Sequence, residues 1–228
     1  MLLKPWDELP EYMHTKEVRP YYDSLKKKQM SLLLKRCFDL IVGIIVFIIL
    51  SPIMIIFSIA IVIDSKGGVF FRQERVTQYG RKFRIFKFRT MVANAESIGT
   101  QVTVQNDMRI TRVGKLLRKT RLDEFPQLIN VILGDMSFVG TRPEVTKYVE
   151  RYTPEMYATL LLPAGITSIA SIQYKDEDEL LANADNVDDV YVNEVLPGKM
   201  KYNLSSITSF SFISEIVTMI KTVIAIMK

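Results

Sequence analysis

Two residue types on which many enzymes depend are almost missing from this sequence. Its 228 residues contain one cysteine, Cys37, and one histidine, His14. A single cysteine excludes a disulfide within the chain, and its position at the edge of an apolar segment predicts a buried structural thiol. His14 lies in a polar stretch far from any motif, so histidine-based triads and histidine-rich metal sites lack their usual residue. Any catalysis would therefore depend on carboxylates and cations.

The composition also lacks the marks of a disordered chain. Hydrophobic residues make up 48% and charged residues 24% of the sequence, as in an ordered globular protein. Lys and Arg number 30 and Asp and Glu 25, which gives a net charge of +5. What this mild excess indicates about binding partners depends on where the cations lie in the fold. The length favours one domain with an appended segment, and so a single active site.

Charge is absent from residues 41–63, which form one long apolar run. About 20 apolar residues are enough to cross a bilayer, so this run exceeds the requirement. A secretory signal peptide would lie at the extreme N-terminus and would have a shorter apolar core. The run therefore predicts a retained membrane anchor.

The flanks of this run bear on how it meets the membrane. Cations lie on both sides, within residues 26–36 and 66–89, whereas a simple span would place one basic cluster on the outer face. Pro52 removes a helical N–H, and the hydroxyl of Ser51 can bond the carbonyl that is left over. The pattern is typical of a re-entrant hairpin broken at Ser51-Pro52, and a single kinked span is the alternative. We expect the charged residues at the entrance to lie near lipid headgroups: Lys35, Arg36 and Asp39.

The rest of the chain predicts a mixed, mostly helical α+β domain. Alternation indicates strands at residues 69–76 and 81–91, joined by a turn near residues 78–80. Helical periodicity indicates helices over 113–117, 125–133 with Gly134 as the stop, 143–152 and 205–228. The last of these carries an apolar stripe that would face either the core or the bilayer. The expected organisation is an N-terminal extension (1–30), a membrane helix (31–64) and a catalytic domain (65–228).

The pair Asp123-Glu124 carries the most chemical information. It falls where the helix over 125–133 begins, and Pro126 favours a first-turn position. The helix dipole and nearby cations should hold both acids ionised. Taken alone, such a pair is usually a helix cap. The cations that bracket it in sequence favour a site for phosphates instead: Lys87, Arg89, Lys115, Arg118 and Arg142.

An ionised aspartate in such surroundings has a definite chemistry. Asp123 could attack phosphorus without a general base and form an acyl phosphate, while Glu124 helps to hold a Mg2+. Residues 139–141 form a small-residue turn before Arg142, where the backbone could approach a phosphate closely.

At this point the sequence resembles a known family. The segments KRCFDLIVG, Ser51-Pro52, VFFRQERV, FRIFKFRTM, RITRVGKLLRKTRLDEFPQLINVILGDMSFVG, TRPE and PAGIT occur in the order found in bacterial sugar transferases called monotopic phosphoglycosyl transferases. The resemblance covers about residues 32–170. It does not depend on one short motif.

The resemblance implies an enzyme of the bacterial inner membrane whose catalytic domain faces the cytoplasm. It implies transfer of a sugar 1-phosphate from a UDP-sugar to undecaprenyl (polyprenyl) phosphate, with release of UMP, a covalent aspartyl intermediate and Mg2+. By position, Asp123 matches the nucleophile and Glu124 the acid that binds metal. The other matches are Lys87, Arg118 and Arg142 near the phosphates and nucleotide, and Ser51 and Pro52 at the membrane break. Together with Arg89, the three cations form the expected substrate-binding set.

The sequence departs from the family after Thr167. Many members have a segment like PGITGxxQVxGR, whereas this chain reads PAGITSIASIQYKDE. Pro163 and Gly165 to Thr167 remain, but the later Gln and Gly-Arg are missing. The way in which the sugar or nucleotide is recognised therefore cannot be transferred from the family.

Other functions fit part of the pattern. The same cations could bind nucleic acid, but there is no recognition motif and their neighbouring aromatics lie beside a lipid anchor, so we expect no nucleic-acid partner. A non-catalytic, membrane-tethered module that binds anionic partners would use Asp123-Glu124 only as a cap. Hydrolysis of nucleotide sugars at the same site would release UMP without a lipid acceptor.

Overall fold

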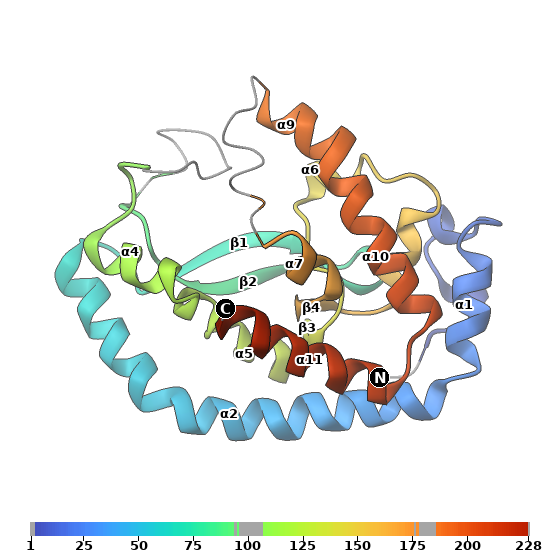
Figure 1. Ribbon diagram of the computed structural model, residues 1–228, viewed down its shortest axis with the longest axis horizontal. Coiled ribbons are helices and arrows are strands. Elements are labelled where there is room, and N and C mark those ends of the chain that lie inside the picture. The colour runs from blue at the N-terminus through green and yellow to red at the C-terminus, as the bar shows by residue number, and fades with distance from the viewer. Residues whose placement is uncertain (1–2, 94, 96–106, 176, 178–185, 228) are drawn as a thin grey trace.

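One long helix runs beneath the rest of the molecule. The computed structural model describes residues 3–93, 95, 107–175, 177 and 186–227. Helix α2 (Gln29–Asp64) follows the lower edge of the view and bends upward toward its C-terminal end (Figure 1). It continues through Pro52, and the hydroxyl of Ser51 donates to the carbonyl of Ile48 at 2.8 Å. Pro52 would otherwise leave this carbonyl unpaired, so the predicted compensation is confirmed, while the helix stays continuous.

Most of α2 is uncovered by protein. Its 36 residues are long and apolar enough to cross a membrane, and only 11% of its most apolar window is buried. A core helix of a water-soluble protein would be mostly buried, so this exposure indicates membrane association. Cys37 is exposed on this helix, which makes the prediction of a buried thiol wrong. The thiol lies on the uncovered side of α2, whereas only the other side contacts the domain.

Both halves of α2 are fastened to the domain. Lys35 and Asp39 are buried rather than open to headgroups, with 3% and 2% of their surfaces exposed. Lys35 donates to the carbonyl of Val139 at 2.7 Å and pairs with Glu215, while Asp39 accepts from the hydroxyl of Ser137 at 2.7 Å. We call Lys35, Asp39 and Glu215 the anchor cluster.

Two charged residues near opposite ends of α2, Arg36 and Asp64, cap the ends of other helices of the domain. Arg36 donates to the carbonyls of Val131 and Ile132 at 2.7 and 3.0 Å, at the C-terminal end of helix α5 (Gln127–Leu133). At the other end, Asp64 accepts from the amide of Val113 at 2.9 Å. These contacts satisfy backbone groups that a helix end leaves without partners.

Two small sheets lie above α2 (Figure 1). Strands β1 (Phe70–Val76) and β2 (Lys82–Phe88) form an antiparallel hairpin in which Phe70 faces Phe88. Strands β3 (Met136–Val139) and β4 (Ala164–Thr167) pair in parallel. The hairpin confirms the predicted strands, including the turn at Gln78–Gly80.

The helices confirm the mostly helical α+β class. Their bounds are α1 (Arg19–Lys26), α4 (Arg112–Lys119), α6 (Thr146–Val149), α7 (Ile169–Gln173), α9 (Val187–Val190), α10 (Leu196–Thr208) and α11 (Phe212–Met227). Short 3-10 turns occupy Trp6–Glu8, Glu11–Met13, Gln78–Gly80, Leu122–Glu124 and Met156–Leu161, and a π-helical turn occupies Tyr191–Val195.

Two predicted helices have different bounds in the structure. The helix expected from Pro143 begins only at Thr146, because Glu144 runs alongside β1 and its carbonyl accepts from the amide of Val76 at 2.9 Å. The helix expected over 205–228 is interrupted after Thr208. Ser211 begins α11, since its hydroxyl accepts from the amide of Ser214 at 3.0 Å. Gly134 ends α5 with φ 86°, as predicted.

The N-terminal extension belongs to the largest core. Met13, Val18 and Leu25 have no exposed surface and pack in one cluster with Leu161 and Met200. Helix α1 also contacts α10 directly. The extension therefore covers the part of the domain built from the Met156–Leu161 turn and α10.

Candidate active site

Asp123 and Glu124 lie in the short 3-10 turn Leu122–Glu124, between α4 and α5. Arg121 adopts a left-handed conformation (φ 55°) that separates this turn from α4. Pro126 is the residue immediately before α5. The acids thus precede the helix as predicted, and they are held in a turn that leads directly into it.

A cluster of charges surrounds Glu124. Its Oε1 accepts from Nζ of Lys87 at 2.8 Å and from Nη2 of Arg142 at 2.7 Å. Strand alternation explains the first contact, because Phe83 and Ile85 are buried beside α5 and Lys87 is the next residue on that face of β2. We call Lys87, Glu124 and Arg142 the pocket cluster.

Arg142 is positioned by the close approach of β3 and β4. A Cβ on Gly140 would lie 2.5 Å from the carbonyl oxygen of Pro163, and one on Gly165 would lie 2.1 Å from the nitrogen of Gly140. The predicted close approach at residues 139–141 is therefore present, but its partner is the backbone of β4 rather than an open position for a phosphate. This close packing of β3 against β4 fixes the backbone that leads to Arg142.

The two carboxylates differ in their electrostatics. Burial alone would raise the pKa of Glu124, but the charges and hydrogen bonds of Arg142 and Lys87 outweigh burial and hold this pKa well below its usual range. Burial raises the pKa of Asp123, and the neighbouring Glu124 adds to this against the opposing charge of Lys87. The expectation that nearby cations favour the ionised form is confirmed for Glu124 and outweighed by burial at Asp123.

The cations of the cluster respond in the same way. Burial lowers the pKa of Lys87, although Glu124 opposes this shift. The pKa of Arg142 is raised, chiefly by the charge of Glu124. Glu124 is thus a neutralised, tightly held carboxylate, whereas Asp123 has no such pair of direct partners among the described residues and keeps a less favourable charge.

A cavity of about 300 Å³ opens beside these residues. This is at the lower end of the size of small-molecule sites. Its walls carry six cations, three acids and two hydroxyl side chains: Lys87, Arg118, Arg121, Arg142, Lys175 and Lys199, Asp123, Glu124 and Glu177, and Ser171 and Tyr174. The excess of cations suits a ligand with several negative charges.

Five of the six predicted chemical residues meet at this cavity: Asp123, Glu124, Lys87, Arg118 and Arg142. Arg89 is elsewhere and 8% exposed, where it donates to the carbonyls of Ser65 and Lys66 at 2.7 and 2.6 Å. It caps the end of α2. Arg89 lies two residues after Lys87 in the same alternating basic segment, so the sequence pattern predicted the same role for both.

Several wall residues were not predicted. Ser171, Tyr174, Lys175 and Glu177 belong to the segment that departs from the family pattern, so no motif identified them. Lys199 did leave a signal. It lies on the same face of α10 as the buried Leu196 and Asn203, and a charge on the buried face of an amphipathic helix calls for an explanation.

The donor set bears on the Mg2+ that the resemblance implies. Within the described residues, no three His, Cys, Asp or Glu side chains come together as a ready-made metal site. Mg2+ is usually held by one or two carboxylates together with substrate phosphates and water. Asp123 and Glu124 supply the two carboxylates, so the residues fit an ion that arrives with a phosphorylated substrate.

Comparison with protein families agrees with this chemistry. The family model described as "Bacterial sugar transferase" matches residues 30–228. The chain belongs to the bacterial sugar transferase family. The match begins one residue after the start of α2 and includes every residue of the cavity wall.

Several relatives carry the name of a lipid carrier, undecaprenyl phosphate. The chain is 34% identical over 233 residues to the UDP-N-acetylgalactosamine-undecaprenyl-phosphate N-acetylgalactosaminephosphotransferase of Aeromonas hydrophila, covering 94% of this chain and 52% of that protein. It is 38% identical over 166 residues to the UDP-glucose:undecaprenyl-phosphate glucose-1-phosphate transferase of Escherichia coli K12, covering 71% and 35%. The chain therefore spans about half, or less, of these relatives.

A shorter relative is matched over more of its length. The putative undecaprenyl-phosphate N-acetylgalactosaminyl 1-phosphate transferase of Bacillus subtilis is 38% identical over 131 residues, covering 58% of this chain and 73% of that protein. The names of the three relatives share the undecaprenyl phosphate carrier, and they give two sugars: N-acetylgalactosamine in two names and glucose in the third.

Proposed function

We propose that this chain transfers a sugar 1-phosphate from a UDP-sugar to undecaprenyl phosphate and thereby begins the assembly of a polysaccharide or glycoconjugate. The observation that carries the proposal is the position of Asp123 in a cation-rich cavity, beside a glutamate that is already paired with Lys87 and Arg142. Membership of the family and the names of its relatives support the same reaction.

The reaction proceeds in two displacements at one phosphorus. A carboxylate oxygen of Asp123 attacks the phosphorus that bears the sugar, and the bond from that phosphorus to the bridging oxygen breaks, so UMP leaves with the electron pair. An oxygen of undecaprenyl phosphate then attacks the same phosphorus and releases Asp123. The products are UMP and undecaprenyl diphosphate sugar, and the enzyme is unchanged.

The residues around Asp123 divide the remaining work. Lys87 and Arg142 fix Glu124, and together with Arg118 they place positive charge along the cavity where the diphosphate would lie. Burial limits the hydration of Asp123, which leaves its carboxylate available to phosphorus. A bound Mg2+ would neutralise charge on the diphosphate and so assist departure of UMP.

The arrangement of α2 supports a monotopic enzyme. Contacts at Lys35 and at Asp64, near opposite ends of the helix, reach the same domain. A straight span would carry one of these ends across the bilayer, away from its partners. We therefore propose that α2 enters and leaves the inner membrane on the cytoplasmic side, with its bend in the lipid. Its exposed apolar side chains, and those of α11, would face the lipid: Leu40, Ile41, Ile44, Ile45, Ile48, Ile49, Ile53, Ile55, Ile56, Ile59, Val62, Ile63, Ile213, Val217, Ile220, Val223 and Ile224.

The reaction is tested with detergent-solubilised protein, Mg2+, a panel of UDP-sugars and undecaprenyl phosphate, with UMP release as the measurement. Asp123→Asn should lower turnover by at least about a thousandfold, because the nucleophile is lost. Asp23→Asn is the matched control, since Asp23 pairs with Arg19 in an exposed position outside the cavity. Turnover retained in Asp123→Asn would refute the nucleophile.

The same assay separates the other functions. UMP release that needs no lipid would indicate hydrolysis, and no UMP from any donor would indicate a binding module. A mass increase of one sugar phosphate, seen on the wild type without lipid and lost in Asp123→Asn, is expected for the covalent intermediate.

Topology requires a separate measurement. In a Cys37→Ser background, single cysteines at the exposed positions Lys27 and Lys66 flank α2. Both should react with a membrane-impermeant thiol reagent from the cytoplasmic side only. Labelling from opposite sides would establish a spanning helix.

A further inference from the structure

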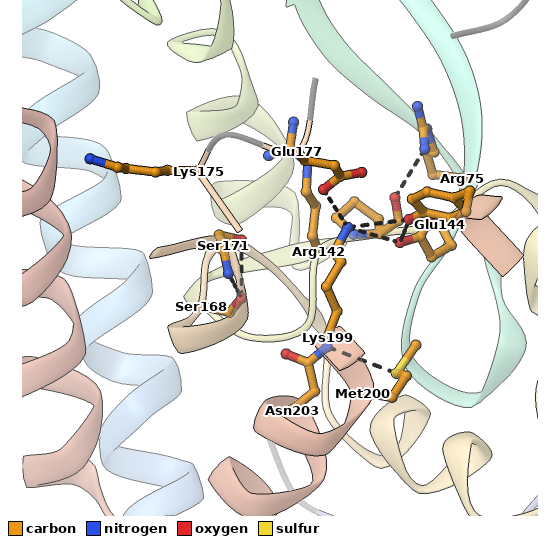
Figure 2. A network of polar contacts seen from close by, with 12 residues as sticks. Arg75, Arg142, Glu144, Ser168, Ser171, Lys175, Glu177, Lys199, Met200 and Asn203 are labelled. Atoms are coloured by element: carbon orange, nitrogen blue, oxygen red, sulfur yellow. Dashed lines mark hydrogen bonds and ion pairs between the residues drawn. The ribbon is translucent and has the colours of Figure 1, made fainter. Parts of the chain in front are cut away.

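One part of the cavity wall differs in chemistry from the phosphate-binding part. It comes from α7, from the residues just after it, and from α10, and it contributes Ser171, Tyr174, Glu177, Lys199 and Lys175. The first three follow Thr167, where the sequence departs from the family pattern. Besides an acid and two hydroxyl groups, this wall contains two lysines: Lys199 pairs with Glu177, and Lys175 points away from Glu177 (Figure 2). The part around Asp123 is lined by Lys87, Arg118 and Arg142.

Glu177 offers a carboxylate oxygen to the cavity. Its side chain is 26% exposed, and Oε2 accepts a hydrogen bond from Nζ of Lys199 at 3.0 Å. The other oxygen, Oε1, has no hydrogen-bond partner among the described residues. A carboxylate oxygen has room for about two hydrogen bonds, so Oε1 can accept donors from a ligand.

Lys199 is held rigidly, although it carries a charge. Its side chain is 6% exposed, and Nζ also lies 3.2 Å from the hydroxyl of Tyr191 and 3.8 Å from Oε1 of Glu144. The hydroxyl of Tyr191 donates to the same oxygen of Glu144 at 2.6 Å. Figure 2 shows Lys199 reaching from α10 to Glu177 and Glu144, with Arg142 alongside. A buried charge with partners on every side has few alternative positions.

The chemistry of this wall suits hydroxyl groups better than phosphates. A carboxylate repels a phosphate, and the cations around Asp123 provide a more favourable position for one. Sugar hydroxyls donate hydrogen bonds to carboxylates without this repulsion. The charge of Glu177 also contributes to the raised pKa of Arg142, so the two parts of the cavity are close enough to interact. A sugar and its own phosphate require this proximity.

We propose that Glu177 determines which sugar is transferred, by accepting hydrogen bonds from hydroxyls of the donor sugar, and that Lys199 is the positioning residue that holds its carboxylate. This inference rests on the proposed function. The Tyr191 and Glu144 side chains hold Lys199 in turn and have no direct contact with the sugar.

The test measures kcat/KM for UDP-glucose, UDP-galactose and their N-acetylamino counterparts, using UMP release with undecaprenyl phosphate. Glu177→Gln keeps the shape of the side chain and removes its charge. The ratio between the best donor and its C4 epimer should change by at least about tenfold, because one hydrogen bond between a sugar hydroxyl and a charged acceptor is weakened. Glu150→Gln, at an exposed glutamate outside the cavity, should leave the ratio unchanged.

Lys199 is tested by coupling. Lys199→Met should shift the donor ratio in the same direction as Glu177→Gln. The double variant should show no further shift, because each single change already removes the oriented carboxylate of Glu177. A lysine with a merely structural role would lower kcat/KM equally for all donors. Glu177→Gln alone keeps the proposal testable if Lys199→Met does not fold, since Glu177 is partly exposed.

Inhibition by UMP distinguishes the sugar from the nucleotide as the group bound. The inhibition constant of UMP should be the same in Glu177→Gln and the wild type. An altered constant would assign Glu177 to the nucleotide and overturn the proposal, as would equal losses for all donors. Absence of UMP release from the wild type with every donor would instead refute the proposed function, and the inference with it.

Discussion

The pocket cluster and the anchor cluster are built from similar residues and have opposite surroundings. Each contains a lysine paired with a glutamate, and both partners are largely removed from solvent. In the anchor cluster, Lys35 and Asp39 also bond the carbonyl of Val139 and the hydroxyl of Ser137, and the cavity that Glu215 borders has a volume of only about 50 Å³. In the pocket cluster, Lys87, Glu124 and Arg142 also line a cavity. Burial of charge therefore does not identify a functional site by itself. A ligand-sized cavity beside the buried charges does.

The comparison also concerns the balance of charge. The anchor cluster holds one cation and two acids, whereas the cavity around the pocket cluster has six cations and three acids. Of these two places, only the cavity has an excess of positive charge that would attract a polyanion. Changes in the pocket cluster should thus act on catalysis, whatever their effect on stability, and changes in the anchor cluster should act on stability alone.

After loss of the nucleophile itself, the largest effect is expected at Glu124. Glu124→Gln should lower kcat/KM by at least about a hundredfold, since the carboxylate that orders Lys87 and Arg142 and would help to hold Mg2+ is lost. UMP release at several Mg2+ concentrations is the measurement. Activity close to that of the wild type would place Glu124 with the anchor cluster, as a structural group.

The anchor cluster is tested by Lys35→Met. This change leaves Glu215, which is 14% exposed, without its cation, and we expect stability to fall by about 3–5 kcal/mol. Thermal unfolding in detergent measures the loss. The double variant with Glu215→Gln should recover part of it, and turnover per folded molecule should stay unchanged. A loss of turnover without a loss of stability would break the distinction between the clusters.

A smaller effect separates the two acids of the active site. Because burial raises the pKa of Asp123 above its usual 3.8, the folded state favours the protonated form, and stability is lost as pH rises through the folded pKa. Asp123→Asn should therefore be at least as stable as the wild type at pH 7, with the difference vanishing near pH 4 and below. Melting curves between pH 4 and 8 measure this. A less stable variant at pH 7 would show that Asp123 contributes to stability as an anion.

Glu124 should show the opposite dependence on pH. Its lowered pKa means that the ionised form is favoured in the folded state, so its contribution is present above the unfolded pKa and is lost as pH falls through the folded one. In the same melting curves, Glu124→Gln should be less stable than the wild type at pH 7.

Local rules predicted much of the fold. Alternation located the hairpin of β1 and β2, and Gly134 marked the end of α5. The pairing of β3 with β4 was not predicted, since each strand has four residues and neither alternates over a useful length. Ser211 did carry a capping signal, but the apolar stripe on both sides of it favoured one continuous helix.

The site was predictable where motif and chemistry coincide. Asp123, Glu124 and their cations meet at one cavity, as predicted. Arg89 was wrongly included, because the sequence of a basic strand does not show which of its cations face a ligand. Glu177 and Lys199 are 22 residues apart and meet only through tertiary structure. Such a pair cannot be found from spacing.

The packing of the N-terminal extension has a consequence for the order of folding. Met13 and Leu25 are buried against residues of α10, which lies more than 170 residues later in the chain. During synthesis, α2 leaves the ribosome long before α10 exists, so the membrane segment is available for insertion while the extension still lacks its partner. Insertion would then precede closure of the core, and the slow formation of these long-range contacts would come last.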